Sequence, residues 1–290
     1  MALTHNPLRG ILLIVVAIAT FSVMDTIAKF LSQSYPVGSV VWARYVINLI
    51  VLSAFLVARG ELGRLRTTRP KTQVVRGLML GASTLLYFTS LTVLPLAEAA
   101  AIGFVLPVFV AILAVPMLNE RIDMARVIAI VVGLSGALIV VRPGTALFTV
   151  YAQLPLAMAL CNAFYQILTR KIAGIEHPLT SLFYGSLIGT LMSTVLLSAG
   201  VAMPVGWFHW TLFLALGVLA TVGHFVLIRA FDYAPATLLA PFVYSQLVWV
   251  MLFGWFVFGD FPDGWSLAGM GIVVASGLYI ANRQRLTARR

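Results

Sequence analysis

The chain has 290 residues, of which 61% are hydrophobic and only 10% charged, and its mean hydropathy is +1.02. Soluble domains carry roughly 25% charged residues, so this sequence lacks the polar surface that water requires. The net charge of +10 is expected to sit in the short loops of a membrane protein and not to bind nucleic acid. A single cysteine, Cys161, excludes a disulfide within the chain.

Ten segments are apolar and long enough to cross a bilayer as helices, which takes about 20 residues each. Proline and glycine in the connections end helices and turn the chain. Because the connections are short, consecutive helices are expected to be antiparallel neighbours, which predicts an all-α membrane protein. The predicted helices cover 8–31, 37–58, 72–93, 95–118, 124–141, 150–171, 178–199, 208–231, 234–258 and 264–282.

Basic residues are distributed unevenly over the predicted connections. With the first residue on the inner side, 16 of the 19 basic residues, Arg76 among them, lie in inner segments and Arg142 lies in an outer one. Lys29 and Arg44 fall inside helices. Since positive charge stays in cytoplasmic loops, both termini are expected in the cytoplasm of a bacterial inner membrane. No cleavable signal peptide is expected, because the N-terminus leads directly into a long apolar run.

The chain also repeats itself at an offset of 140 residues. This shift places Pro95 on Pro235, Gly77 on Gly217, Glu120 on Asp260 and Asp123 on Asp263. We therefore expect two five-helix units, residues 1–145 and 146–290. An odd number of helices in each unit inserts the two in opposite orientations. Many secondary transporters use such inverted repeats to form a substrate site at the interface, near the middle of the membrane.

Two stretches resemble the ending of an EamA repeat of the drug/metabolite transporter superfamily. One runs from Leu94-Pro95-Leu96-Ala97-Glu98 through Leu106-Pro107 to Leu118-Asn119-Glu120-Arg121, and the other from Ala234-Pro235-Ala236 through Phe258-Gly259-Asp260 to Ala275-Ser276-Gly277-Leu278-Tyr279. The resemblance covers nearly the whole chain, which is similar in length and layout to the YddG-type bacterial amino-acid exporters. It implies a transporter of amino acids or other metabolites, although Asp260 stands where glutamate is usual.

Ionisable residues inside a membrane are costly and are therefore candidates for function. Asp25 and Lys29 are four residues apart on one helix face, where they can pair, and Arg44 lies at a similar depth in the next helix. These three are expected either to line a cavity for ammonium and carboxylate groups or to neutralise one another as a structural cluster. Glu98 is expected to bind a cation or proton, or to stabilise a helix N-terminus.

Histidine can change charge near neutral pH. His224, whose counterpart in the other repeat is Thr84, is expected to line the cavity, to transfer protons or to be a hydrogen-bonded interior histidine. Glu120 and Asp260 end two repeat-related helices and are expected to cap helices or pair with loop bases.

Uncharged polar and aromatic residues gather on the repeat-related helices. Amide, hydroxyl and ring groups are expected to bind a zwitterion with a bulky side chain, or alternatively to hydrogen-bond helices to one another. These residues are Tyr87, Asn162, Tyr165, Gln166, Tyr244, Gln246 and Trp249. Pro107 and Pro241 fall inside predicted helices, where they act as hinges for alternating access or as plain kinks.

The sequence shows no nucleotide-binding motif, no catalytic constellation and no metal-ligand spacing among its four histidines. No cofactor and no metal are therefore expected, and the protein is expected not to be an enzyme. The resemblance favours a secondary transporter, monomeric in the bilayer, that exports aromatic and other neutral amino acids by alternating access. The alternative within transport is uptake of a vitamin or nucleoside-like cofactor such as riboflavin. An intramembrane enzyme and a structural or receptor protein are the other classes, and the repeat favours neither.

Overall fold

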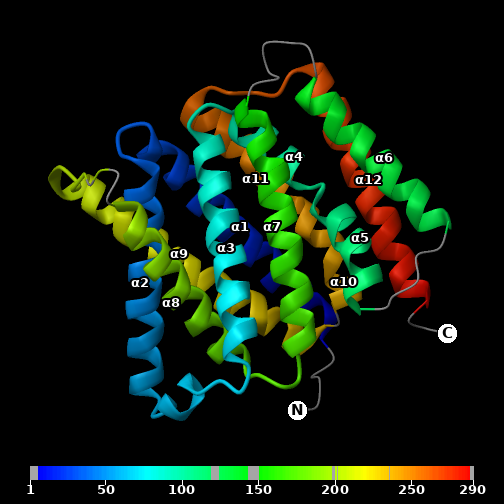
Figure 1. Ribbon diagram of the computed structural model, residues 1–290. Helices are drawn as coiled ribbons and strands as arrows, with labels where there is room; N and C mark the ends of the chain where they lie inside the picture. The colour runs from blue at the N-terminus through cyan, green and yellow to red at the C-terminus, as the bar shows by residue number, and fades with distance from the viewer. Residues whose placement is uncertain are drawn as a thin grey trace.

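The computed structural model describes residues 6–118, 124–142, 150–197, 200, 202–234 and 236–287, and the regular elements within these ranges are helical. Figure 1 shows α2 toward one edge of the bundle, α6 and α12 side by side along the other, and α1, α3 and α7 between them. Glu120, Asp123 and Pro235 lie outside the described residues.

The helices of the first half follow the predicted ranges closely, except that the predicted helix 95–118 is divided into two. They are α1 (Pro7–Ser32), α2 (Val37–Ala58), α3 (Pro70–Leu91), α4 (Leu96–Gly103), α5 (Leu106–Leu118) and α6 (Met124–Val141), with a short 3-10 turn at Leu62–Leu65. The second half contains α7 (Val150–Ile172), α8 (Pro178–Leu196), α9 (Gly206–Tyr233), α10 (Ala236–Leu239), α11 (Ser245–Phe253) and α12 (Gly264–Thr287). A 3-10 segment, Ala240–Tyr244, joins α10 to α11, and a π-helical turn, Gly254–Phe258, follows α11.

Several of these helices have the length and composition to cross a membrane. Within the described ranges they are Pro7–Ser32, Val37–Ala58, Pro70–Leu91, Leu96–Leu118, Pro178–Leu196 and Gly206–Tyr233. Shorter apolar helices cover Val127–Val141, Phe242–Phe258 and Gly264–Tyr279. Large apolar side chains are exposed along the outside of the bundle, for example Val195 and Phe256. Such a surface suits hydrocarbon, so the chain is an all-helical, multi-pass membrane protein.

The predicted helices 95–118 and 234–258 are each broken. The first is interrupted at Phe104 and Val105, and Pro107 is the second residue of α5. Pro107 therefore does not kink the middle of a helix as expected. It lies in the first turn of α5, where backbone N–H groups have no intrahelical acceptor, so its missing N–H removes no hydrogen bond. Pro241 falls in the 3-10 segment that breaks the second region. Non-helical backbone at membrane depth is tolerated where it is buried in protein or lines a cavity.

Close helix packing depends on small residues at the contacts. α1 packs on α9, α3 packs on α7, and α6 packs on α12. At the last contact, a Cβ added to Gly136 would lie 2.9 Å from the Gly269 carbonyl oxygen, and a Cβ on Gly269 would lie 2.7 Å from that of Gly136. The two backbones therefore touch directly, as is common between membrane helices.

Candidate functional site

A cavity of about 290 Å³ with both apolar and polar walls lies among α1, α2, α3, α4, α7 and α9 and the broken region around α11. It brings together predicted residues from both halves of the chain: Asp25, Arg44, Tyr87, Asn162, Tyr165, His224 and Gln246. Ser83, Thr84, Phe21, Phe88, Phe104 and Met158 also line it. We call it the central cavity. Ligand sites commonly combine such apolar walls with a few convergent polar groups.

Arg44 is the buried cation of the central cavity, with only 6% of its surface exposed. Its Nη1 donates to Thr84 Oγ1 at 3.0 Å, and its guanidinium lies 4.8 Å from the Tyr45 ring centre. The Tyr45 hydroxyl also contacts Thr84 Oγ1, at 2.8 Å. Among the described residues, Nε has no hydrogen-bond partner and no carboxylate pairs with the guanidinium. A buried, incompletely paired cation is costly, and an anionic ligand would relieve that cost.

Asp25 is the buried anion of the same cavity. Gln246 Nε2 donates to its Oδ2 at 3.3 Å, so a residue 221 positions away in the chain holds the carboxylate in place. Within the residues that the structure describes, its Oδ1 accepts no hydrogen bond, so this oxygen can accept one from a ligand.

Neutral polar groups complete the wall. Asn162 Nδ2 donates to Ser83 Oγ at 3.3 Å, and Gln166 Nε2 donates to Asn162 Oδ1 at 3.2 Å. Gln166 therefore supports Asn162 from behind and does not itself line the cavity. The Tyr87 hydroxyl is buried and has no partner in the described part of the chain, which leaves it free to bind a ligand.

His224 is fixed in one tautomer by its own helix. Its Nδ1 lies 2.7 Å from the Ala220 carbonyl oxygen, which can only accept, so Nδ1 carries a proton. In the neutral ring Nε2 is then an acceptor. The Phe21 ring packs edge-on against the imidazole with centroids 5.0 Å apart. Thr84, which the 140-residue offset of the sequence pairs with His224, lies in the same cavity.

Lys29 does not join Asp25, which corrects the expected pair. Its Nζ donates to the Leu94 carbonyl oxygen at 2.9 Å and pairs with Asp260 Oδ2 at 3.0 Å. The ammonium also lies 4.8 Å from the Phe258 ring centre. Lys29 is close to the end of α1, where the α3–α4 and α11–α12 connections offer these acceptors, and its long side chain reaches them. Asp25 lies one turn deeper.

Glu98 lies at this end of the bundle too, among the charged residues Arg142, Asp260 and Asp263. It lies in the first turn of α4 and accepts a hydrogen bond from Ser266 Oγ at 3.0 Å. Arg142 pairs with Asp263 and donates to Ser266 Oγ. The hydrogen bond from Arg142 holds the pKa of the Asp263 carboxyl well below its usual range. We call Lys29, Glu98, Arg142, Asp260, Asp263 and Ser266 the end cluster.

Two aromatic residues predicted to bind the substrate, Tyr244 and Trp249, do not line the central cavity. Tyr244 stacks on Phe104 with ring centroids 5.0 Å apart, and Trp249 stacks on Phe253 at 6.2 Å.

Arg76, assigned from the sequence to an inner connection, is 2% exposed inside α3 and lies 5.1 Å from the Tyr165 ring centre. Sequence reasoning missed Phe21, Ser83, Phe104 and Met158 as lining residues, because no charge or motif sets them apart from other helix positions.

A many-helix membrane protein with a partly polar central cavity formed by both halves of its chain belongs to the class of small-molecule transporters. The chain is a member of the EamA-like transporter family, whose model matches residues 8–142 and again residues 150–282. It is therefore a membrane metabolite transporter.

Several curated proteins are similar over almost their whole length. A Rickettsia prowazekii S-adenosylmethionine uptake transporter is 31% identical over 281 residues, covering 94% of this chain and 92% of that protein. A Pseudomonas aeruginosa pseudopaline exporter is 29% identical, with 95% and 97% covered. A Vibrio cholerae riboflavin transporter is 27% identical, with 100% and 98% covered. One solved crystal structure matches with a TM-score of 0.65 at 18% identity, covering 96% of this chain and 97% of that one, which shows the shared fold.

Proposed function

We propose that this chain is a secondary transporter for metabolites that carry an α-amino-acid group, with aromatic and other neutral amino acids as the simplest substrates. The observation that carries the proposal is the buried, incompletely paired guanidinium of Arg44 in the same cavity as the Asp25 carboxylate. Arginine binds carboxylates through paired, charge-assisted hydrogen bonds. A substrate carboxylate at Arg44 and a substrate ammonium at Asp25 would neutralise both buried charges.

The arrangement of the halves supports alternating access between two inverted repeats, 1–145 and 146–290. Pairs of residues separated by 140 positions line the central cavity together. The four pairs are Asp25 with Tyr165, Thr84 with His224, Gly103 with Val243, and Leu106 with Gln246. The helix contacts follow the same relation. When the two halves are exchanged, α1 corresponds to α7 and α9 to α3, and α1 packs on α9 just as α7 packs on α3. A cavity formed between two such units can open to either side as one moves against the other. The distribution of basic residues favours cytoplasmic termini in the inner membrane.

A second candidate is uptake of a nucleoside-bearing amino acid. It is favoured by the similarity to S-adenosylmethionine uptake transporters, whose named substrate combines methionine with an adenosyl group. Such a molecule would use the same two charged residues for its amino-acid end. For the direction of transport, the prediction from the sequence is still export of amino acids.

Reconstitution into liposomes tests the proposal. Labelled alanine, phenylalanine, tryptophan, S-adenosylmethionine and riboflavin would be offered separately, with and without a pH gradient. Saturable flux of the amino acids, in competition with one another, is the expected result. Flux of S-adenosylmethionine alone would favour the second candidate. Flux of riboflavin alone would contradict both, because that ring compound has no α-amino-acid group for Arg44 and Asp25.

A further inference from the structure

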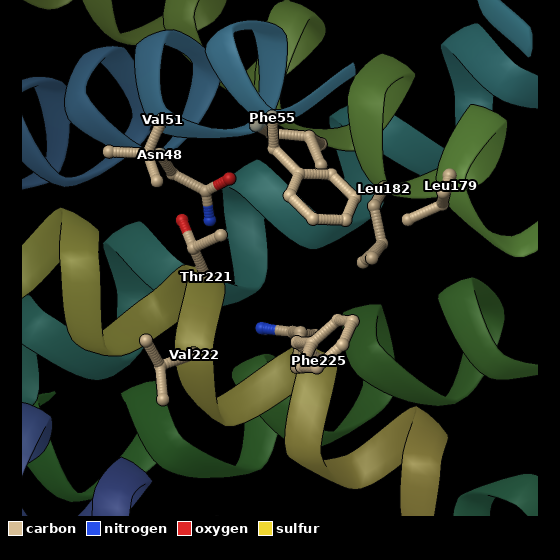
Figure 2. A pocket seen from close by; sticks show the side chains of 10 residues that line it. Asn48, Val51, Phe55, Leu179, Leu182, Thr221, Val222 and Phe225 are labelled. Atoms are coloured by element: carbon tan, nitrogen blue, oxygen red, sulfur yellow. The ribbon is translucent and has the colours of Figure 1, made fainter. Parts of the chain in front are cut away.

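A second cavity of about 240 Å³ lies between α2, α8 and α9. Its walls are mostly apolar and include Val51, Phe55, Leu182 and Phe225. Figure 2 shows Phe55 and Leu182 on one side of this space and Phe225 across from them. We call it the side pocket.

The side pocket adjoins the central cavity. His224 lines both of them. On α2, Arg44 lines the central cavity and Asn48, four residues on and therefore on the same helix face, lines the side pocket. Phe55 continues that face two turns further. One face of α2 thus leads from the charged site into the apolar pocket.

Three polar residues, Asn48, Thr221 and His224, border the side pocket. Figure 2 shows the Asn48 side chain and the Thr221 hydroxyl directed toward each other from α2 and α9. Asn48 Oδ1 accepts from Ser186 Oγ at 2.8 Å, while its Nδ2 donates to none of the residues that the structure describes. His224 Nε2 is an acceptor, as shown above. The accessible surface of the side pocket itself is almost wholly apolar, which suits the faces of a ring or a hydrocarbon chain.

We propose that the side pocket is a subsite for the ring or long apolar extension of a transported molecule whose amino-acid end lies at Arg44 and Asp25. This inference rests on the proposed function for the charged end. It adds the chemical class of the other end, an aromatic or extended apolar group. The pocket also reaches the outside of the bundle, since Val222 and Phe225 are each 44% exposed, so extensions of different lengths fit.

Filling the pocket tests this subsite. Val51→Trp would occupy the space, and Ile50→Trp is the matched control, because Ile50 is the adjacent residue, is 60% exposed and does not line the pocket. Flux of labelled tryptophan and of labelled alanine would be compared in liposomes. In Val51→Trp the flux of tryptophan should fall at least tenfold relative to alanine. In Ile50→Trp the ratio of the two fluxes should stay at the wild-type value.

Phe225→Ala supplies a second measurement that does not overfill the helix contact. Loss of this wall should raise the KM for tryptophan severalfold and leave that for alanine unchanged. Phe231→Ala, on the same helix, at 41% exposure and outside both cavities, should change neither. The subsite would be overturned if the tryptophan-to-alanine flux ratio in Val51→Trp and the KM for tryptophan in Phe225→Ala both stayed at their wild-type values. The pocket would then be assigned to a lipid chain. Absence of amino-acid flux in the wild type would instead overturn the proposed function.

Discussion

Phe104 and Tyr244 stack on each other with ring centroids 5.0 Å apart and planes inclined at 28°, although 140 residues separate them. This separation is also the offset at which the two halves of the sequence match. Each residue lies beside an interruption of its helical region, Phe104 between α4 and α5 and Tyr244 at the end of the 3-10 segment. The contact therefore joins the two broken regions, and Phe104 presents its ring to the central cavity.

Tyr244→Ala should disturb the cavity wall by removing the support of Phe104. Offset aromatic pairs contribute about 0.5–1.5 kcal/mol beyond their buried area, so we expect a severalfold rise in the KM for aromatic substrates. Tyr244→Phe keeps the ring and should transport normally. Gly277→Ala should resemble Tyr244→Ala, because a Cβ there would occupy the space of the Tyr244 hydroxyl. Equal kinetics for Tyr244→Ala and Tyr244→Phe would count against this role.

Helix positions were predictable because long apolar runs bounded by proline and glycine leave few alternatives. The expected range 124–141 coincides with α6, and 37–58 coincides with α2. The break at residues 104 and 105 was not predictable, since these residues are as apolar as their surroundings, whereas the second break falls at Pro241, where a hinge or kink was expected. Lys29 was paired wrongly because spacing along one helix cannot reveal acceptors from connections 65 and 231 residues away.

The Lys29–Asp260 pair should contribute more to stability than an exposed pair. Lys29 is buried, so loss of Asp260 leaves a charge without its partner, at a cost of about 1–3 kcal/mol. Asp260→Asn, Lys29→Met and the double variant form a cycle whose coupling energy is measured by unfolding in detergent. The exposed pair Arg229–Asp232 is the control, with an expected coupling below about 1 kcal/mol. Equal coupling energies in the two cycles would show that the Lys29–Asp260 pair stabilises the fold no more than the exposed pair does.

Asp263 gives a prediction for pH. Because the hydrogen bond from Arg142 lowers the pKa of its carboxyl in the folded state, its stabilising contribution is complete above the unfolded-state pKa of about 3.9. The contribution is lost as the pH falls toward the folded-state value. Asp263→Asn should therefore lower Tm by the same small amount at pH 8 and at pH 6, and the difference should shrink below pH 4. A difference that changes between pH 8 and pH 6 would contradict this assignment.

The α6–α12 contact should tolerate no added methyl group at its centre. Gly269→Ala would place a Cβ against the Gly136 carbonyl oxygen, whereas Gly271, on the same helix, has open space around its Cβ position. We expect Gly269→Ala to lower Tm. Gly271→Ala should leave Tm unchanged or raise it, since alanine favours a helix over glycine by about 0.8–1.0 kcal/mol. A similar Tm for the two variants would mean that the backbones do not touch there.

The most direct test of the account is competition for phenylalanine flux in liposomes by compounds that lack one charged group. Phenethylamine has no carboxylate, and hydrocinnamate has no ammonium. The Arg44–Asp25 site predicts that phenylalanine competes at least tenfold better than either compound, since a charged hydrogen bond contributes about 1.5–3 kcal/mol. In Arg44→Gln the advantage over phenethylamine should disappear, while Arg59→Gln, at the exposed end of α2, should keep it. Equal competition by all three compounds in the wild type would contradict recognition of an amino-acid group in the central cavity.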